Sequence, residues 1–118
     1  MNDFTIAQYL AYANYIAGTW YSEIPDEMLV FSFLYDYMQE SDMLIKEGNN
    51  CLETTYSIQN VLENDWLLVV WNKRENKTAF YHIKLLNPDM LVLLTRNHQV
   101  KVYSRKINTG FLNNTFEE

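Results

Sequence analysis

The sequence predicts a mainly β protein: an eight-stranded antiparallel up-and-down β-barrel preceded by one N-terminal α-helix. Two observations carry this prediction. Apolar side chains follow a helical spacing only over the first seventeen residues, and after Gly18 the chain consists of short β-branched and aromatic runs separated by Asn, Asp, Gly and Pro. Short turns between successive runs favour a meander, and closing a meander into a barrel removes its two exposed edges.

The chain of 118 residues is long enough for one hydrophobic core. We expect a single globular unit with three parts. These parts are a helix at 1–17, a barrel domain at 18–106 and a loosely ordered tail at 107–118.

The helix is expected to begin at Asn2 or Asp3, either of which can act as an N-cap. Apolar residues recur every three or four positions, at Phe4, Ala7, Ala11 and Tyr15. Gly18 ends the helix, because glycine adopts positive φ without a steric penalty.

Eight runs are expected to form the strands. Their ranges are 19–24, 28–37, 42–47, 52–59, 66–73, 77–85, 90–96 and 99–106. The segments between them, such as "IPDE", "EGNNC" and "RENK", are typical turn sequences. In the second run, "VFSFLYDY" places four aromatic residues on one strand face, where they either line a pocket or fill a small barrel.

Charge and composition disfavour several classes of function. A net charge of −6 argues against nucleic acid as a partner, because binding to phosphates needs an excess of Lys and Arg. The lone Cys51 allows neither an intrachain disulfide nor a thiolate metal cluster. No apolar run is long enough to span a membrane and no signal-peptide pattern is evident, so we expect a soluble, cytoplasmic protein.

Two short motifs resemble the lipocalins and the wider calycin superfamily. The first predicted strand begins with Gly18, Thr19 and Trp20, a Gly-x-Trp motif, and the last ends with Arg105. The resemblance implies that Arg105 packs across Trp20 and closes one end of the barrel, with Gly18, Trp20 and Arg105 as structural residues. Such a contact is physically sensible, because a stacked guanidinium can cap an open hydrophobic end.

The sequence departs from these families at several points. Extracellular lipocalins usually have a signal peptide, a disulfide and a helix after the barrel, and none is evident here. The related intracellular fatty-acid-binding proteins also begin with Gly-Thr-Trp, but they insert a two-helix lid after the first strand. Between Ile24 and Met28 there is no room for such a lid.

The last strand of the fatty-acid-binding proteins carries an Arg-x-Tyr pair that grips a carboxylate, and Lys101 and Tyr103 are similar to it. Lysine lacks the bidentate fork of arginine, and Lys101 could instead face solvent. If Arg105 points to Trp20, strand alternation puts Lys101 and Tyr103 on the same face and the neighbouring valines outside. Outward-facing valines would be unusual in a soluble barrel, so three alternatives stay open. The strand contains a bulge near Ser104, or the N-terminal helix covers the valines, or Arg105 is not the capping residue.

The first functional hypothesis is a non-catalytic barrel that binds a small apolar or amphipathic ligand inside. No cofactor and no metal are expected. The candidate ligand-binding residues are Tyr35, Trp66, Phe80, His82, Lys101 and Tyr103.

The second hypothesis is a filled barrel that acts as a protein–protein interaction or regulatory subunit without a ligand. Runs such as "LLVVW" and "LVLL" are apolar on both faces, so the helix or a second copy in a homodimer would have to cover the outside. A curved α+β sheet with a catalytic acid and histidine is a third possibility. The enzyme class is disfavoured but left open, because no nucleotide, metal or acyl-transfer motif occurs and His82 and His98 are isolated.

Overall fold

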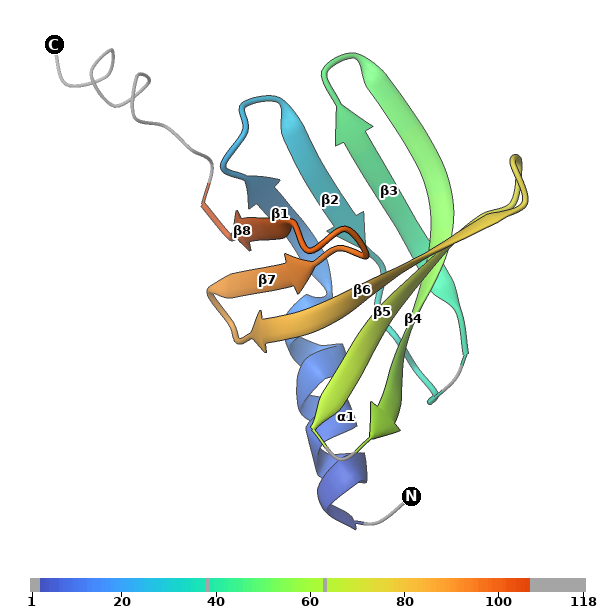
Figure 1. The fold of residues 1–118 in the computed structure, drawn as a ribbon, viewed down its shortest axis with the longest axis vertical. Coiled ribbons are helices and arrows are strands. Elements are labelled where there is room, and N and C mark those ends of the chain that lie inside the picture. Colours follow the sequence, from blue (N-terminus) through green and yellow to red (C-terminus); the bar gives the residue numbers. More distant parts are fainter. Residues whose placement is uncertain (1–2, 38, 63, 107–118) are drawn as a thin grey trace, which may run out of the picture.

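The computed structural model describes residues 3–37, 39–62 and 64–106. Helix α1 (Asp3–Ile16) precedes eight strands that close into an antiparallel barrel, each strand pairing with the next and β8 with β1 (Figure 1). The strands are β1 (Gly18–Ser22), β2 (Glu27–Phe31), β3 (Ser41–Glu47), β4 (Asn50–Leu62), β5 (Asp65–Asn72), β6 (Lys77–Leu86), β7 (Met90–Leu94) and β8 (Val100–Ser104). The predicted fold class is therefore confirmed, while the predicted tail at 107–118 and the possible cap at Asn2 lie outside the described residues.

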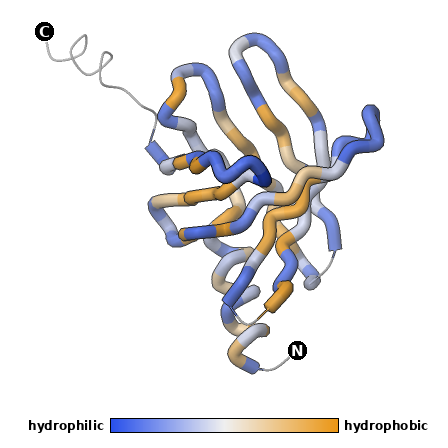
Figure 2. The backbone as a smooth tube through the Cα atoms, viewed as in Figure 1, coloured by the Kyte–Doolittle hydropathy of each residue, from blue (hydrophilic) through white to orange (hydrophobic). Residues whose placement is uncertain are grey.

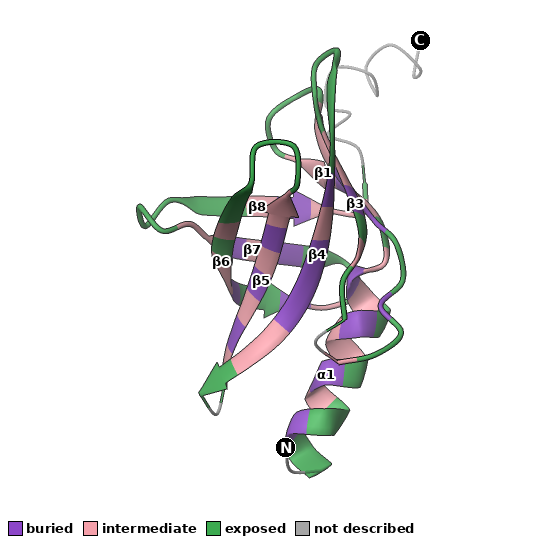
Figure 3. Cartoon of the chain, turned by 90° about the vertical axis from the view of Figure 1, so that its right-hand side faces the viewer, coloured by how far each residue is buried: buried purple, intermediate pink, exposed green. Residues whose placement is uncertain are grey.

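Hydrophobic residues recur along the strands and hydrophilic residues gather in the turns, most visibly in the β5–β6 hairpin (Figure 2). Buried and partly exposed positions alternate along β5, as expected for a strand with one face toward the core (Figure 3). No helix in the described part of the chain is long and apolar enough to cross a membrane.

The core fills the half of the barrel nearest α1. Phe31 packs edge-on against Tyr56 with ring centroids 4.8 Å apart, and the Tyr56 hydroxyl donates a hydrogen bond to the Ser32 carbonyl. The fully buried side chains are Trp20, Tyr56, Ile16, Leu34, Ile58, Leu68, Leu91 and Leu93. These packed side chains occupy much of the barrel interior, and two of them, Leu68 and Leu93, also border the cavity described below.

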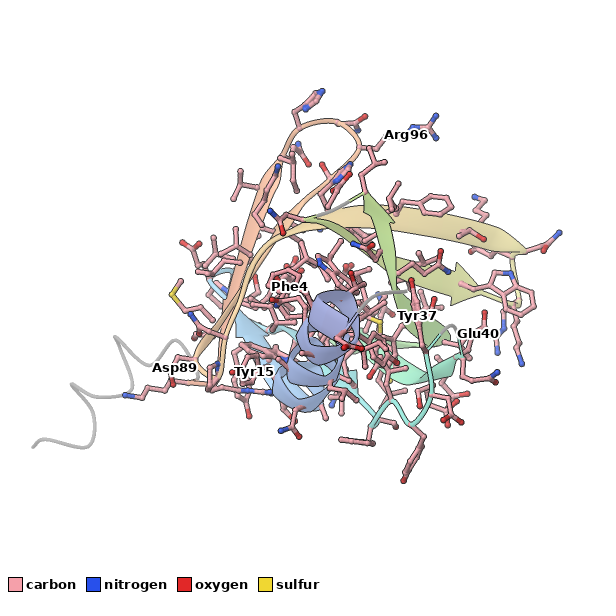
Figure 4. All side chains as sticks on the ribbon, turned by 90° about the horizontal axis from the view of Figure 1, so that it is seen from below. Phe4, Tyr15, Tyr37, Glu40, Asp89 and Arg96 are labelled. Atoms are coloured by element: carbon pink, nitrogen blue, oxygen red, sulfur yellow. The ribbon has the colours of Figure 1, made fainter. Side chains whose placement is uncertain are left out.

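Helix α1 lies at the lower end of the barrel, in front of the ring of strands when seen from below (Figure 4). Its buried residues are Thr5, Tyr9, Ala13 and Ile16. The predicted spacing is correct in period, but the face is different, since Phe4 is 66% exposed. Tyr9 sets the buried face, because its ring stacks on Trp66 and its hydroxyl donates to the Asp36 carbonyl at 3.0 Å.

The predicted second strand is too long. Strand β2 ends at Phe31, and the segment 32–37 crosses the lower end of the barrel without strand structure. Phe33 and Tyr35 are exposed and contact each other, whereas Leu34 is buried. The predicted row of aromatic residues on one strand face is therefore absent. The segment leaves the sheet and contacts α1 instead, where Tyr9 binds the Asp36 carbonyl and packs against the Tyr37 ring.

The closure between β1 and β8 is short. Only two residue pairs join these strands, Tyr21 with Ser104 and Ser22 with Tyr103, whereas seven pairs join β4 and β5. The side chain of Arg105, immediately after β8, reaches across this seam.

Candidate functional site

The closed end of the barrel is built around Arg105. Its Cζ lies 3.6 Å from the ring centroid of Trp20, and its Nη1 donates to the Thr19 carbonyl at 2.9 Å. Its Nη2 donates to the carbonyls of Ala17, at 2.8 Å, and Tyr15. The guanidinium thus satisfies carbonyls at the C-terminal end of α1, where a helix leaves acceptors unpaired and favours positive charge.

Gly18 has two reasons to be glycine. Its φ is +108°, a conformation that side chains rarely adopt, and a Cβ at this position would lie 3.1 Å from Arg105 Nη1. The sequence indicated only the first reason. The Trp20 Nε1 donates to the Ile16 carbonyl at 2.8 Å, so the closing contact of Trp20 and Arg105 implied by the family resemblance is present and is tied to the helix.

A cavity of about 80 Å³ lies at the opposite, open end of the barrel. This volume holds roughly five water-sized groups, so it suits a very small molecule or one end of a larger one. Its apolar lining consists of Met28, Leu29, Met43, Ile45, Leu68, Val70 and Leu93. Its polar lining consists of Glu27, Lys46, Glu47, Tyr81, Lys101 and Tyr103.

Two turns hold the glutamates at the mouth of this pocket. Glu27 begins β2 and is directly opposite Glu47 at the end of β3. The neighbouring residues Asp26 and Gly48 both have positive φ, and the Gly48 N–H donates to the Asp26 carbonyl at 2.8 Å. The hydrogen bond between the two turns therefore fixes the backbone beside both glutamates.

Tyr103 places a phenol in the pocket. The residue is only 6% exposed, and its hydroxyl makes no hydrogen bond to any residue that the structure describes. Burial raises the pKa of the Tyr103 phenol, and the neighbouring Tyr81, Glu27 and Glu47 raise it further. The pocket therefore contains a hydroxyl that is free to bind a guest.

Lys101 and Tyr103 are the two predicted ligand-binding residues that line the pocket. They pair with Leu93 and Leu91 on the inner face, and β8 needs no bulge to bring Arg105 over Trp20. Val100 is 63% exposed, so α1 does not cover it. Of the alternatives that the sequence left open for β8, the structure therefore shows Arg105 as the capping residue without a bulge.

Two further predicted ligand-binding residues, Trp66 and Tyr35, lie away from the pocket, toward the end of the barrel that α1 occupies. Trp66 is buried between Tyr9 and Tyr12 of α1, with ring centroids 6.5 and 5.4 Å away. Tyr35 belongs to the irregular segment after β2 and is 81% exposed. Neither lines the pocket.

The last two candidates, Phe80 and His82, are on the outer face of β6, where His82 pairs with Leu67 and Leu94. The inner face carries Tyr81, which lines the pocket. The His82 Nδ1 lies 3.0 Å from the Asp65 Oδ1, and both side chains are nearly half exposed. Because β6 carries apolar residues on both faces, the alternating pattern does not show which face points into the barrel. Tyr81 was missed for this reason.

Sequence reasoning also missed Glu27 and Glu47, since acidic residues beside turns usually serve local hydrogen bonds. One signal was available: in "MLIKE", Met43, Ile45 and Glu47 share a strand face. Within the described ranges, no three His, Cys, Asp or Glu side chains are grouped so as to hold a metal ion.

Comparison with known proteins gave no relatives: no protein-family model, curated protein or solved structure matches this chain.

Proposed function

We propose that this chain is a small lipocalin-like barrel that binds a small apolar or amphipathic molecule in the open-end pocket and does not convert it chemically. The observation that carries this proposal is Tyr103, whose side chain lines the cavity and is 6% exposed, and whose hydroxyl has no hydrogen-bond partner among the described residues. Binding sites for small molecules commonly combine apolar walls with a few such polar groups.

Kinship with the lipocalins and calycins is part of the same proposal. The closed eight-stranded barrel, the Gly18–Trp20 motif and the Arg105 contact support it. The packed lower half of the barrel limits the guest to the upper half, so we expect a ligand smaller than a fatty acid, or one whose remainder extends into solvent.

Filling the pocket tests this function. Ile45 lines the pocket, and its neighbour Leu44 faces the outside of β3. We expect n-butanol, titrated to millimolar concentrations, to shift the amide resonances of pocket residues in ¹H–¹⁵N spectra. Ile45→Phe should abolish these shifts and Leu44→Phe should preserve them. Equal shifts in both variants, or none in the unmodified protein, would contradict the proposal.

The outer surface favours a second candidate function, that of a homodimer without an internal ligand. Leu67, His82, Leu94 and Val100 are successive neighbours across β5 to β8 on the outer face. Phe80 and Val100 are 51% and 63% exposed there. Sedimentation velocity tests this candidate: a dimer that Val100→Lys converts to a monomer supports it, and a monomeric unmodified protein rejects it.

A further inference from the structure

The charge arrangement at the pocket mouth points to a more specific ligand than an apolar molecule. Glu27 and Glu47 are a directly opposed pair on the inner face of β2 and β3, and like charges in this position repel. In the described part of the chain, neither carboxylate lies within 4.0 Å of a Lys, Arg or His nitrogen. The two negative charges therefore have no close counter-ion among the described residues.

The two lysines of the pocket do not replace such a counter-ion. Lys46 contributes to the pocket lining, but it alternates with Ile45 and Glu47 and so belongs to the outer face of β3. Lys101 is on the inner face but is exposed to solvent. A solvated ammonium beyond ion-pair distance compensates a carboxylate only weakly.

Tyr103 is the second, independent observation. The residue is 6% exposed and lines the same cavity, and its hydroxyl, which is not among the fully buried polar atoms, has no hydrogen-bond partner in the described chain. The pKa of Tyr103 is raised partly by Glu27 and Glu47, which places its phenol within electrostatic reach of both carboxylates. Tyr81 lies in the same lining, and the pKa of its phenol is raised by burial and by Glu47.

From this geometry we propose that the pocket selects a ligand with a positively charged ammonium group on a short apolar body. Glu27 and Glu47 bind the ammonium, the tyrosine hydroxyl of Tyr103 accepts a hydrogen bond from it, and the apolar floor takes the alkyl part. An ammonium is also attracted to the faces of aromatic rings such as those of Tyr81 and Tyr103. This inference rests on the proposed binding function and specifies, in addition, that the ligand carries a positive charge.

A carboxylate ligand, which the likeness of Lys101 and Tyr103 to an Arg-x-Tyr pair suggests, fits this mouth less well. An anion in the pocket would approach two carboxylates, and the only cations it would gain from the lining are two exposed, solvated lysines. A bare divalent cation also fits poorly, because Ca²⁺ takes six to eight oxygen ligands and this site offers two carboxylates.

The test compares three probes with the same alkyl chain: n-butylammonium, n-butanol and butanoate. Their dissociation constants are measured by ¹H–¹⁵N chemical-shift titration of the full chain at low salt. We expect butylammonium to bind about tenfold tighter than butanoate, because only the ammonium can form a charge-assisted hydrogen bond with the glutamates. The double variant Glu27→Gln, Glu47→Gln should lose about that factor for butylammonium and keep its affinity for butanol.

The matched control is Glu53→Gln, because Glu53 is exposed on β4 and does not line the pocket. Its spectra should show unchanged binding of all three probes. If butanoate binds as tightly as butylammonium, or if the double variant keeps its butylammonium affinity, the inferred charge preference is wrong while the binding pocket stands. If none of the probes binds, the proposed function and this inference both fail.

Discussion

The guanidinium of Arg105 lies over the indole of Trp20, with Cζ 3.6 Å from the ring centroid, and both side chains donate hydrogen bonds to carbonyls at the end of α1. One cluster therefore joins the helix, the first strand and the residue after the last strand. Contacts so distant in sequence make the closed end of the barrel sensitive to single substitutions.

Arg105→Lys should lower the free energy of unfolding by about 2 kcal/mol, because lysine cannot serve three carbonyls and stack on an indole at once. Urea denaturation measures the change. Arg96→Lys, at an exposed site between β7 and β8, is the control and should shift stability by less than about 0.5 kcal/mol. Equal effects in the two variants would show that the Arg105 contacts contribute little.

Gly18→Ala should destabilise the protein by about 2 kcal/mol or more, since the added Cβ meets the Arg105 guanidinium at a φ that side chains rarely adopt. Gly48→Ala is the matched comparison, because Gly48 also has positive φ but open space around its Cβ position. We expect this second variant to cost only about 1 kcal/mol in the same denaturation experiment. A larger loss at Gly48 would contradict the steric role of Gly18.

Tyr9→Ala tests which face of α1 is buried. It removes a side chain that is 3% exposed and packs on Trp66, so it should cost about 3–5 kcal/mol. Phe4→Ala, on the face that the sequence suggested, should change stability by less than about 0.5 kcal/mol. Thermal unfolding followed by circular dichroism compares the two, and the reverse order would place the helix on the barrel in a different rotation.

Alkaline pH should destabilise the protein through its buried tyrosines. Burial raises the pKa of Tyr56 and Tyr103 above the ordinary value of 10.0, so the folded state keeps protons that the unfolded state releases. Their stabilising contribution is complete below pH 10 and declines above it, by about 1.4 kcal/mol per pH unit for each phenol.

The measurement is urea denaturation at several values of pH between neutrality and 11. Tyr103→Phe should flatten the alkaline decline, because it removes one of the phenols whose pKa is raised. Tyr35→Phe, which changes an 81% exposed ring, should leave the decline as it is. A decline that Tyr103→Phe does not alter would mean that this phenol ionises without unfolding.

Local patterns were enough to predict the order of elements. The change from helical spacing to strand alternation at Gly18, and the turn residues between runs, predicted one helix followed by eight strands in the observed order, although the second strand was drawn too long. For β8 the sequence left several alternatives open, and the structure selects the one in which Arg105 packs on Trp20 and Lys101 and Tyr103 share the inner face without a bulge. These features depend on neighbours in sequence or on one strong long-range motif.

The pocket needed information that the sequence does not carry locally. Glu27 and Glu47 meet only because β2 and β3 pair in one register, and Phe80 and His82 face outward because β6 has the opposite parity to the one considered. The buried face of α1 is likewise set by Tyr9, whose partners Asp36 and Trp66 are distant in sequence. Tertiary pairing, rather than residue preference, decides each of these.

The short seam between β1 and β8 has a consequence for self-association. A barrel avoids open strand edges only while its first and last strands stay joined, and here two residue pairs hold them together. Arg105 spans this junction by donating a hydrogen bond to the Thr19 carbonyl, so it helps to keep β1 and β8 together. If these contacts break, the edges of β1 and β8 are free to pair with the same strands of another molecule. Strand exchange between copies is therefore expected to start at the β1–β8 junction.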